Sequence, residues 1–482
     1  MAITIVQNPK PLVPSFNPIY TVVDSDNKTQ QGFRYVYSVY DDETNTLIGA
    51  PLPVAPEPVN GYGAIDISKL IQSQVNYNID LNSTVFQAPN NYVKYRIEVY
   101  ESYLYSWDFT GITGTLGQTN FTLQGSTPSV WNFNDEITIV TSIGGTPYDG
   151  NFTVLTTPGN LTVAIANYQS GYTATSGTVY WANNKKTTSS ATIIDGLYAF
   201  NGVRSFKDFF NYNEVDYLID QAVSSTTKSL LTDMPVSGFT VTPEQDLWLS
   251  FFRNPATTGQ TIQYRIQNSN GDIFYNAASF GTDTSLECSV GAGPGNINPF
   301  VQSGTLPVIK SDTTYYDFWL AETAANGGSQ LSKKYRINVD QRCKISDKEI
   351  LFKDRMGSWL SYAFQLKDKE TGTIERQNYN KYLGAVDVVN GWEYQLKDAG
   401  QTNYSVNVTK EFELNTNWMN DEMSVLFEQL LSSPTTFIKM DDGIYYSCIV
   451  QDNGFETARQ RNKQLIRKSV RVRMSNLDAI NV

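Results

Sequence analysis

Two stretches in the first hundred residues decide the fold class, because apolar and polar side chains alternate along both. The first is Phe33–Tyr40, FRYVYSVY, and the second is Tyr92–Val99, YVKYRIEV. A period of two places successive side chains on opposite faces of a strand. The aromatic and β-branched residues that dominate both stretches fit the pleated surface of a sheet. Together they predict a sandwich of the immunoglobulin or fibronectin type.

The composition extends this prediction to the whole chain. Its 482 residues include 30 Tyr, 24 Phe and 8 Trp but no histidine. The absence of histidine excludes a Ser-His-Asp or Cys-His nucleophilic site, a zinc site with histidine ligands and a haem held by histidine. The abundance of aromatic residues is typical of stacked antiparallel sheets. We therefore expect a structural or binding protein made of β-domains that is not an enzyme and has no cofactor.

Charge and cysteine content limit the partners and the cellular compartment that we expect for the protein. The 36 basic and 48 acidic residues give a net charge of −12. Such a chain is poorly suited to grip DNA, although nucleic acid could slide past it without sticking. The three cysteines, Cys288, Cys343 and Cys448, are far apart and form no CxxC pair, which predicts free thiols. No stretch has the pattern of a signal peptide or the length of a membrane span, so we expect a soluble chain made in the cytosol.

Shifts in composition divide the chain into four predicted domains. Residues 1–106 together with 191–235 are expected to form an N-terminal β-sandwich. Residues 107–190, rich in Thr, Gly, Asn and Ser, are expected to form a small β-barrel inserted into it. Residues 236–345 are predicted to be a second β-sandwich. Residues 346–482 are predicted to be a C-terminal β domain with one helix.

That helix is expected at about residues 420–432. One apolar face is indicated by five residues at helical spacing: Met423, Leu426, Phe427, Leu430 and Leu431. Asn420 is a candidate N-cap, and Pro434 ends the helix. Elsewhere the dipeptides Asn270-Gly271 and Asp442-Gly443 predict tight turns between two strands.

Several short motifs contain residues that could act in catalysis or bind a ligand. A glycosidase needs only two carboxylates, and candidates are Asp41-Asp42-Glu43, Asp135-Glu136 and Asp441-Asp442. All three lie in predicted turns, where aspartate is favoured because it bonds to nearby backbone groups. The segment Asp24–Lys28 begins like a calcium loop, but Lys28 stands where an oxygen ligand is needed. The glycine-rich segment Gly291–Asn296 lacks the residues of a phosphate-binding loop. We predict neither a catalytic nor a metal site.

A basic cluster near the C-terminus contrasts with the acidic chain. Its members are Arg459, Arg461, Lys463, Arg467, Lys468, Arg471 and Arg473. Three interpretations are open for it: a solvated strand face, a contact with an acidic neighbouring subunit, and a contact with nucleic acid. In the last strand Val470, Val472 and Met474 are expected to face the core, so that Arg471 and Arg473 point outward.

Particular stretches resemble virion structural proteins of tailed Bacteroidetes phages, crAss-like phages included. They are Gln7–Asp26, Phe33–Tyr35, Phe352–Phe364, Ile374–Arg376, Glu413–Glu422, Leu430–Pro434 and Asn462–Leu465. The segment Tyr148–Val154 looks like β-modules found in phage tail proteins. Residues 236–345 carry little of the resemblance. The resemblance implies a tail, neck or ring component and carries no active site with it.

We therefore expect a non-enzymatic subunit of a phage tail or neck, located in the virion and made in the cytoplasm of the bacterial host. It should form a six- or twelve-fold ring of identical copies through which the genome passes, and contact other tail, neck or portal proteins. Neither sequence-specific nucleic-acid binding nor membrane insertion is expected. An extended N-terminal arm and the last basic strand are predicted to lie at subunit interfaces, because both could offer unpaired backbone to a partner. These interface residues are Ile3, Val6, Pro9, Pro11, Leu12, Pro14, Arg467, Lys468, Arg471 and Arg473.

Two alternatives remain open. The first is a receptor-binding adhesin, in which Tyr148, Tyr168, Tyr172 and Trp181 of the inserted module stack on sugars. The second, more distant, is a glycan depolymerase that uses two of the carboxylates described above. Host-cell binding by residues 107–190 would favour the adhesin, and glycan release that is lost on changing an acidic pair would favour the enzyme.

Overall fold

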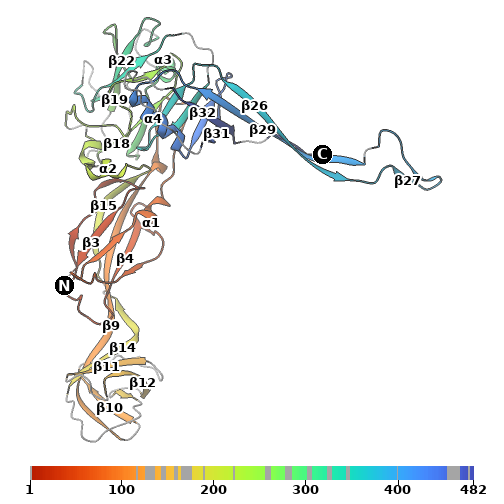
Figure 1. The fold of residues 1–482 in the computed structure, drawn as a ribbon. Helices are drawn as coiled ribbons and strands as arrows, with labels where there is room; N and C mark the ends of the chain where they lie inside the picture. The colour runs from red at the N-terminus through yellow and green to blue at the C-terminus, as the bar shows by residue number, and fades with distance from the viewer. Residues whose placement is uncertain are drawn as a thin grey trace. The chain divides into compact units, whose positions relative to one another are not determined.

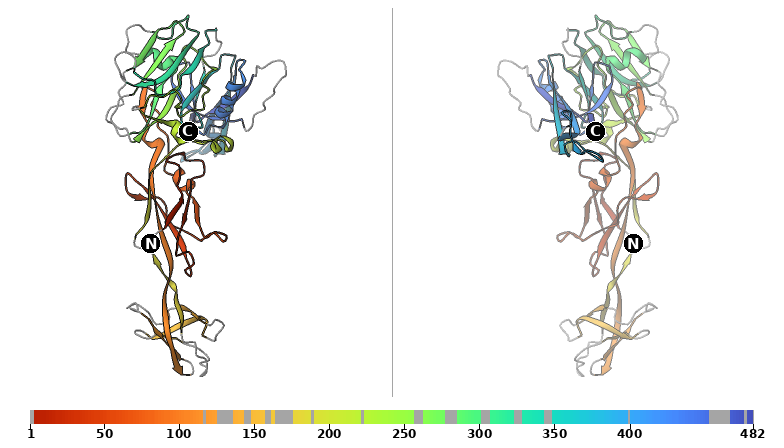
Figure 2. Two further views of the ribbon diagram at one scale, coloured as in Figure 1. Left: turned by 90° about the vertical axis from the view of Figure 1, so that its left-hand side faces the viewer. Right: turned by 90° about the vertical axis from the view of Figure 1, so that its right-hand side faces the viewer.

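The chain is mainly β, as predicted, and a computed structural model divides it into two compact units (Figures 1 and 2). Unit 1 comprises Met1–Gln74 and Val93–Ala199, and unit 2 comprises Val75–Tyr92 and Phe200–Val482. The structure describes residues 3–115, 118–124, 136–142, 148–156, 161–163, 176–187, 190–220, 223–255, 262–276, 285–300, 307–322, 328–342, 348–398, 400–452, 467–475 and 478–481.

The described residues of unit 1 form one short α-helix and two sheets. Its elements are β1 (Thr4–Gln7), β2 (Leu12–Pro14), β3 (Tyr20–Asp24), β4 (Arg34–Asp41), β5 (Thr46–Leu47), β6 (Leu52–Val54), β7 (Gly63–Asp66), α1 (Ser68–Gln72), β9 (Tyr92–Thr115), β10 (Gln118–Leu123), β11 (Glu136–Thr141), β12 (Gly150–Thr156), β13 (Leu161–Val163), β14 (Gly177–Thr187) and β15 (Thr192–Phe200). A three-stranded sheet has the order β1-β3-β7, and the other eleven strands form a second sheet.

The two stretches that predicted the sandwich are confirmed as paired strands. β4 and the first part of β9 are antiparallel, with Tyr37 opposite Val99 and Val39 opposite Ile97. These four side chains are buried, which explains the strict alternation in the sequence. Tyr37 buries its ring and donates its hydroxyl to the Gly63 carbonyl at 2.7 Å, so the polar end of the side chain is satisfied.

The inserted module differs from the prediction. Strands β10, β13, β12, β11, β14 and β9 pair in that order, and β10 also pairs with β9. Beyond the module, β9 continues as a partner of β4 and β15. The module was expected to be separate from the sandwich, whereas its strands and those of the sandwich belong to the same eleven-stranded sheet. One long strand can contribute side chains to two different hydrophobic cores, because its backbone hydrogen bonds do not depend on the identity of its side chains.

Unit 2 contains three α-helices and nineteen strands within its described residues. They are β8 (Val85–Gln87), α2 (Phe206–Phe210), β16 (Leu218–Ile219), β17 (Phe239–Val241), β18 (Trp248–Arg253), β19 (Ile262–Asn268), β20 (Ile273–Asn276), β21 (Glu287–Gly291), α3 (Pro294–Phe300), β22 (Tyr315–Glu322), β23 (Tyr335–Val339), β24 (Glu349–Lys353), β25 (Trp359–Ala363), β26 (Lys369–Asn380), β27 (Ala385–Asp387), β28 (Gly391–Glu393), β29 (Gln401–Asn415), α4 (Asp421–Ser432), β30 (Thr436–Lys439), β31 (Tyr445–Val450), β32 (Ser469–Met474) and β33 (Asp478–Asn481).

Two sheets and α4 enclose one large hydrophobic core in unit 2. The five-stranded sheet has the order β17-β23-β22-β19-β20, and the main path of the twelve-stranded sheet is β26-β29-β32-β31-β30-β24-β25-β18-β21-β8. The core contains residues of both sheets and extends from Ile219 to Val472. The predicted domains 236–345 and 346–482 thus share a core. Both predicted tight turns are present, between β19 and β20 and between β30 and β31.

Helix α4 confirms the prediction for residues 420–432. Asn420 caps it by accepting a hydrogen bond from the Met423 amide at 2.8 Å. Met423, Phe427 and Leu430 are buried in the core, and the helix ends two residues before Pro434. Of the shorter α-helices within the described residues, α1 lies where Asp66–Ile71 suggested a single helical turn, whereas α2 and α3 were not predicted, because one or two turns leave no periodic signal.

Candidate interaction site

The predicted N-terminal arm is folded onto its own chain. β1 pairs with β3, and β2 pairs with β15. Ile3, Pro9, Leu12 and Pro14 are buried, whereas Val6 and Pro11 are exposed. The premise that the arm is unpaired is therefore wrong, because proline fixes φ without preventing strand pairing at an edge. An interface role for these six residues stays a prediction.

The predicted C-terminal strand is also paired on both sides. β32 lies between β29 and β31, so it has no free backbone edge to offer. The orientation of its side chains is confirmed: Val470 and Val472 are buried, and Arg471 and Arg473 are exposed.

The basic face of β32 meets acidic residues within its own chain. Glu413 lies opposite Arg471 and Glu411 opposite Arg473, and Arg471 also pairs with Asp452 at 3.2 Å. Further along, Lys468 pairs with Glu428 at 3.3 Å, and Arg467 is exposed. Arg459, Arg461 and Lys463 lie outside the described residues. These contacts favour the interpretation of the basic cluster as a solvated strand face. They do not test a contact with a partner.

Some of the residues that were expected to bind sugars or to act in catalysis are buried or paired within the chain. Tyr148 and Trp181 are buried in the core of the inserted module, so the expectation that they stack on sugars is wrong. Tyr168, Tyr172 and Asp135 lie outside the described residues. Asp42 is paired with Lys94 at 2.9 Å, which holds the pKa of this carboxyl below its usual range.

No metal site is evident at the calcium-like segment. There the Asp24 carboxylate accepts a hydrogen bond from Lys28 at 2.8 Å. Among the residues that the structure describes, no three Cys, Asp or Glu side chains are grouped so as to hold a metal ion. Within that same part of the chain, no helix is both long and apolar enough to span a bilayer.

The most conspicuous surface is one that sequence reasoning did not single out. Strands β26 and β29 form a long antiparallel ribbon, registered from Lys369 opposite Glu413 to Asn380 opposite Gln401. Figure 1 shows this ribbon leaving the sheet of unit 2, with β27 near its end. We call residues 369–415 the arm. Every residue of β26 is exposed, so the arm covers no core of its own chain on that strand.

Support from the rest of unit 2 ends before the arm does. β32 pairs with Glu411–Asn415 and β33 with Ser405–Val408 of β29. From Gln401 to Tyr404, β29 lies alongside β26. A two-stranded ribbon alone in water is marginally stable at best. We therefore expect the outer arm to be held by something outside this chain.

The end of the arm exposes large apolar side chains. We define the arm tip as residues 381–398. Val388 and Leu396 are fully exposed, and Tyr382 is 94% exposed. The other large apolar side chains exposed on the tip are Leu383, Val386, Val389, Trp392 and Tyr394. Single exposed apolar residues are ordinary on a protein surface, but eight within eighteen residues mark an interaction site.

The backbone of the tip is built by its own hydrogen bonds. β27 and β28 pair with Ala385 opposite Glu393, and the Asp387 carboxylate accepts bonds from the amides of Val389 and Asn390 at 2.7 and 3.1 Å. These two donors lower the pKa of Asp387 below its usual value. Gly384 has φ of +83°, and a Cβ there would meet the Glu393 carbonyl. These local hydrogen bonds fix the backbone of the tip. Its apolar side chains therefore stay exposed to solvent instead of collapsing into a core.

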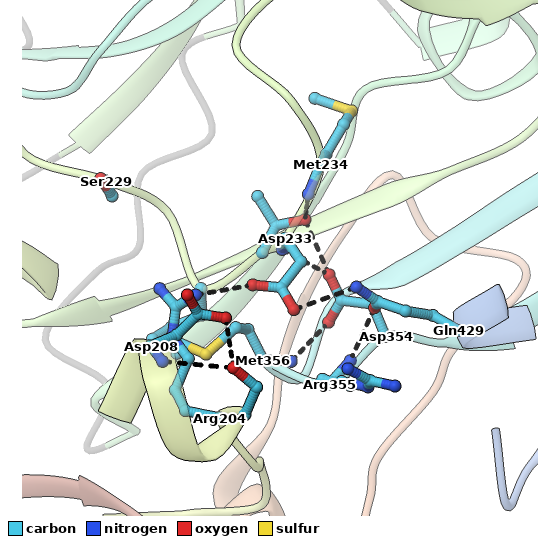
Figure 3. A network of polar contacts seen from close by, with 12 residues as sticks. Arg204, Asp208, Ser229, Asp233, Met234, Asp354, Arg355, Met356 and Gln429 are labelled. Carbon is cyan, nitrogen blue, oxygen red and sulfur yellow. Dashed lines mark hydrogen bonds and ion pairs between the residues drawn. The ribbon is translucent and has the colours of Figure 1, made fainter. Parts of the chain in front are cut away.

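A network of polar residues holds the body of unit 2 together (Figure 3). The Asp354 carboxylate accepts four hydrogen bonds: from the amides of Asp233, Met356 and Ser358 and from the Thr232 hydroxyl, at 2.8 to 3.0 Å. Burial raises the pKa of Asp354 above its usual range, and these donors oppose the shift. Every donor belongs to the fold itself, so the network fixes the turn between β24 and β25.

The same network connects α4 to this turn. Asp233 pairs with Arg204 at 2.9 Å and accepts a bond from the Gln429 side chain at 3.0 Å. Gln429 lies on α4 and also accepts a bond from the Arg355 amide at 3.2 Å. A strongly perturbed carboxylate can indicate a catalytic group. Here the complete set of internal partners favours a structural role.

A second buried cluster involves Glu349 of β24. Lys439 lies 2.6 Å from Asp246 and 3.8 Å from Glu349, and the Tyr445 hydroxyl bonds to Asp246 at 2.8 Å. Burial, with the added repulsion of Asp246, raises the pKa of Glu349 from 4.5 to about 8, although Lys439 opposes the shift. Glu349 is therefore protonated at neutral pH in the folded chain.

The unfolding free energy is expected to fall as pH rises from about 4.5 to 8. Over this window the folded chain keeps a proton on Glu349 that the unfolded chain releases, so deprotonation favours unfolding. Replacing Glu349 by Gln should remove the part of this slope that Glu349 causes, while the part due to Asp354, whose pKa is also raised, remains. Relative to wild type, E349Q should gain about 1–3 kcal/mol between pH 5 and pH 8.5. Urea titrations of both chains at the two pH values measure the difference, and parallel profiles would contradict the assignment.

Unit 2 also has an open cavity of about 120 Å³ beside the N-terminus of α4. Apolar side chains of Val241, Tyr362, Met419 and Met423 line it together with the polar groups of Gln245 and Gln365. Arg342 and Trp418 are exposed at its opening. Arg342 forms a bidentate pair with Asp340, at 2.8 and 2.6 Å, which holds the pKa of Asp340 below its usual range.

Comparisons with known proteins give no family. No family model matches the chain, and no curated protein matches it. One solved structure with some similarity is a crystal structure of a tetra-tandem repeat in the extending region of a large adhesion protein. It is 9% identical, the match covers 86% of this chain and 94% of that chain, and the TM-score is 0.14. That TM-score is too low to support any argument about this protein.

Proposed function

We propose that the chain is a non-enzymatic structural subunit of a bacteriophage tail or neck that assembles with copies of itself into a ring around the genome. The single observation that carries the proposal is the apolar arm tip, which extends beyond the strands that support the arm. A surface of this kind needs a partner to cover it. The resemblance to phage virion proteins supplies the setting.

Assembly into a ring is consistent with an arm tip that protrudes from the subunit. A closed ring uses two different patches, one on each neighbour. The arm tip protrudes, so it suits insertion into a different patch on a neighbour, which is the kind of contact that a ring uses. The net charge of −12 is compatible with a lumen past which DNA slides.

The setting is tested by locating the chain in an intact particle. Polyclonal antibodies raised against the whole chain, imaged by electron microscopy on purified virions, should label the tail or neck after the capsid has been removed. Virions that carry no copy of the chain would overturn the proposal. Labelling confined to the distal fibres, together with loss of host-cell binding, would favour an adhesin instead.

A further inference from the structure

We propose that the cavity beside α4 receives the Tyr382 side chain from the arm tip of a second copy of this chain. This inference rests on the proposed assembly through the arm and names both halves of the contact. Tyr382 is the most exposed aromatic residue of the tip, whereas the cavity is a hollow on the body of unit 2.

The size of the cavity fits one aromatic ring. Its volume is about 120 Å³, somewhat less than the roughly 150 Å³ of an enclosed apolar cavity that holds benzene, so a ring would fill this open cavity and reach into its opening. Tyr362, Met419 and Met423 would contact the faces and edge of a ring. A long aliphatic side chain would fill the same volume but form no hydrogen bond with the polar groups of the lining.

The polar lining fits a phenol. Gln245, Gln365 and Asn417 carry amide groups in the cavity wall, and Asn417 already donates to Gln365 at 2.8 Å. A tyrosine hydroxyl both donates and accepts, so it can bond to an amide group without breaking that pair. Tyrosine is also one of the residues that most often anchor protein interfaces.

The charges around the two halves are complementary. Asp421 and Glu422, in the first turn of α4, are exposed next to Asn420 and Met423 of the cavity wall. Lys381 directly precedes Tyr382 on the tip. A tip seated in the cavity would bring this cation to the acidic first turn of the helix. Lys397 lies on the same tip and serves as a control of equal charge.

The closing experiment uses the full-length chain with benzoylphenylalanine in place of Tyr382. Light and isotope-heavy chains are mixed, allowed to assemble and irradiated, and the crosslinked peptides are identified by mass spectrometry. The expected product joins a light arm to a heavy peptide that contains Thr240–Gln245 or Asn417–Met423. Light–heavy crosslinks elsewhere would overturn the cavity as acceptor while leaving arm-mediated assembly intact.

Two substitutions test the contact without a crosslinker. Ala363→Leu, which fills part of the cavity, and Lys381→Glu are each expected to weaken self-association about tenfold in sedimentation, whereas Lys397→Glu should change it less than twofold. Equal effects of the two charge reversals would contradict the docking geometry. A monomeric chain that instead binds phosphatidylcholine vesicles through Tyr382 would overturn both this inference and the proposed assembly.

Discussion

Replacing Val388, Val389 and Leu396 by serine is expected to abolish self-association while leaving the chain folded. All three side chains are almost completely exposed, so their loss removes no contact within the chain. Burying each against a neighbour contributes about 1.5 kcal/mol, and three together correspond to roughly three orders of magnitude in the association constant. Sedimentation velocity over a range of concentrations measures the change.

A matched control separates the tip from exposed apolar surface in general. Val59, Val140 and Ile273 are also exposed aliphatic residues, but none lies on the arm. Their replacement by serine should leave self-association unchanged. If both triple variants assemble like wild type, the arm tip is not an assembly surface.

Asp354→Asn is expected to destabilise unit 2 by about 3 kcal/mol. The carboxylate accepts four hydrogen bonds, two on each oxygen. An amide can accept on only one atom, so its NH₂ group would face either the Met356 and Ser358 amides or the Asp233 amide and the Thr232 hydroxyl, and at least one backbone N–H would lose its acceptor. Each donor left unsatisfied costs about 1–3 kcal/mol. Hydrogen exchange of β24 and β25 peptides in increasing urea measures the loss.

The control for this substitution removes an exposed carboxylate of the same type. Asp441 lies in the exposed turn between β30 and β31, and Asp441→Asn should change stability by less than about 0.5 kcal/mol. A small effect of Asp354→Asn, comparable to that of the control, would mean that the network in Figure 3 does not hold the body of unit 2.

The parts of the fold that the sequence predicts are those in which burial imposes a period. The alternation in Phe33–Tyr40 and Tyr92–Val99 reflects a buried face on each strand, and α4 has both a cap and an apolar stripe. The division into four domains did not anticipate the shared core of unit 2. Which strands close a common core depends on long-range pairing, such as that of β8 with β21, which no local pattern reports.

The candidate site was not predicted, because an exposed apolar segment looks like a buried one in sequence. Val386, Val388 and Val389 would be read as a core strand in any single-sequence analysis. One signal was available: Asn390-Gly391 is a strong turn dipeptide, and Gly391 has φ of +78° between β27 and β28. The N-terminal arm was misjudged because its prolines do not prevent pairing: Pro14 lies in the edge strand β2, and Pro9 and Pro11 lie between β1 and β2.

The most direct test of arm-mediated assembly is hydrogen–deuterium exchange of the arm tip in the assembled chain. The account predicts that amides of residues 382–396 exchange slowly in the assembly, and at least tenfold faster when the chain is diluted to monomers. The serine variant of the tip should show only the fast rate. Equal exchange of these amides in assembled and monomeric chains would contradict the claim that one copy covers the arm tip of another.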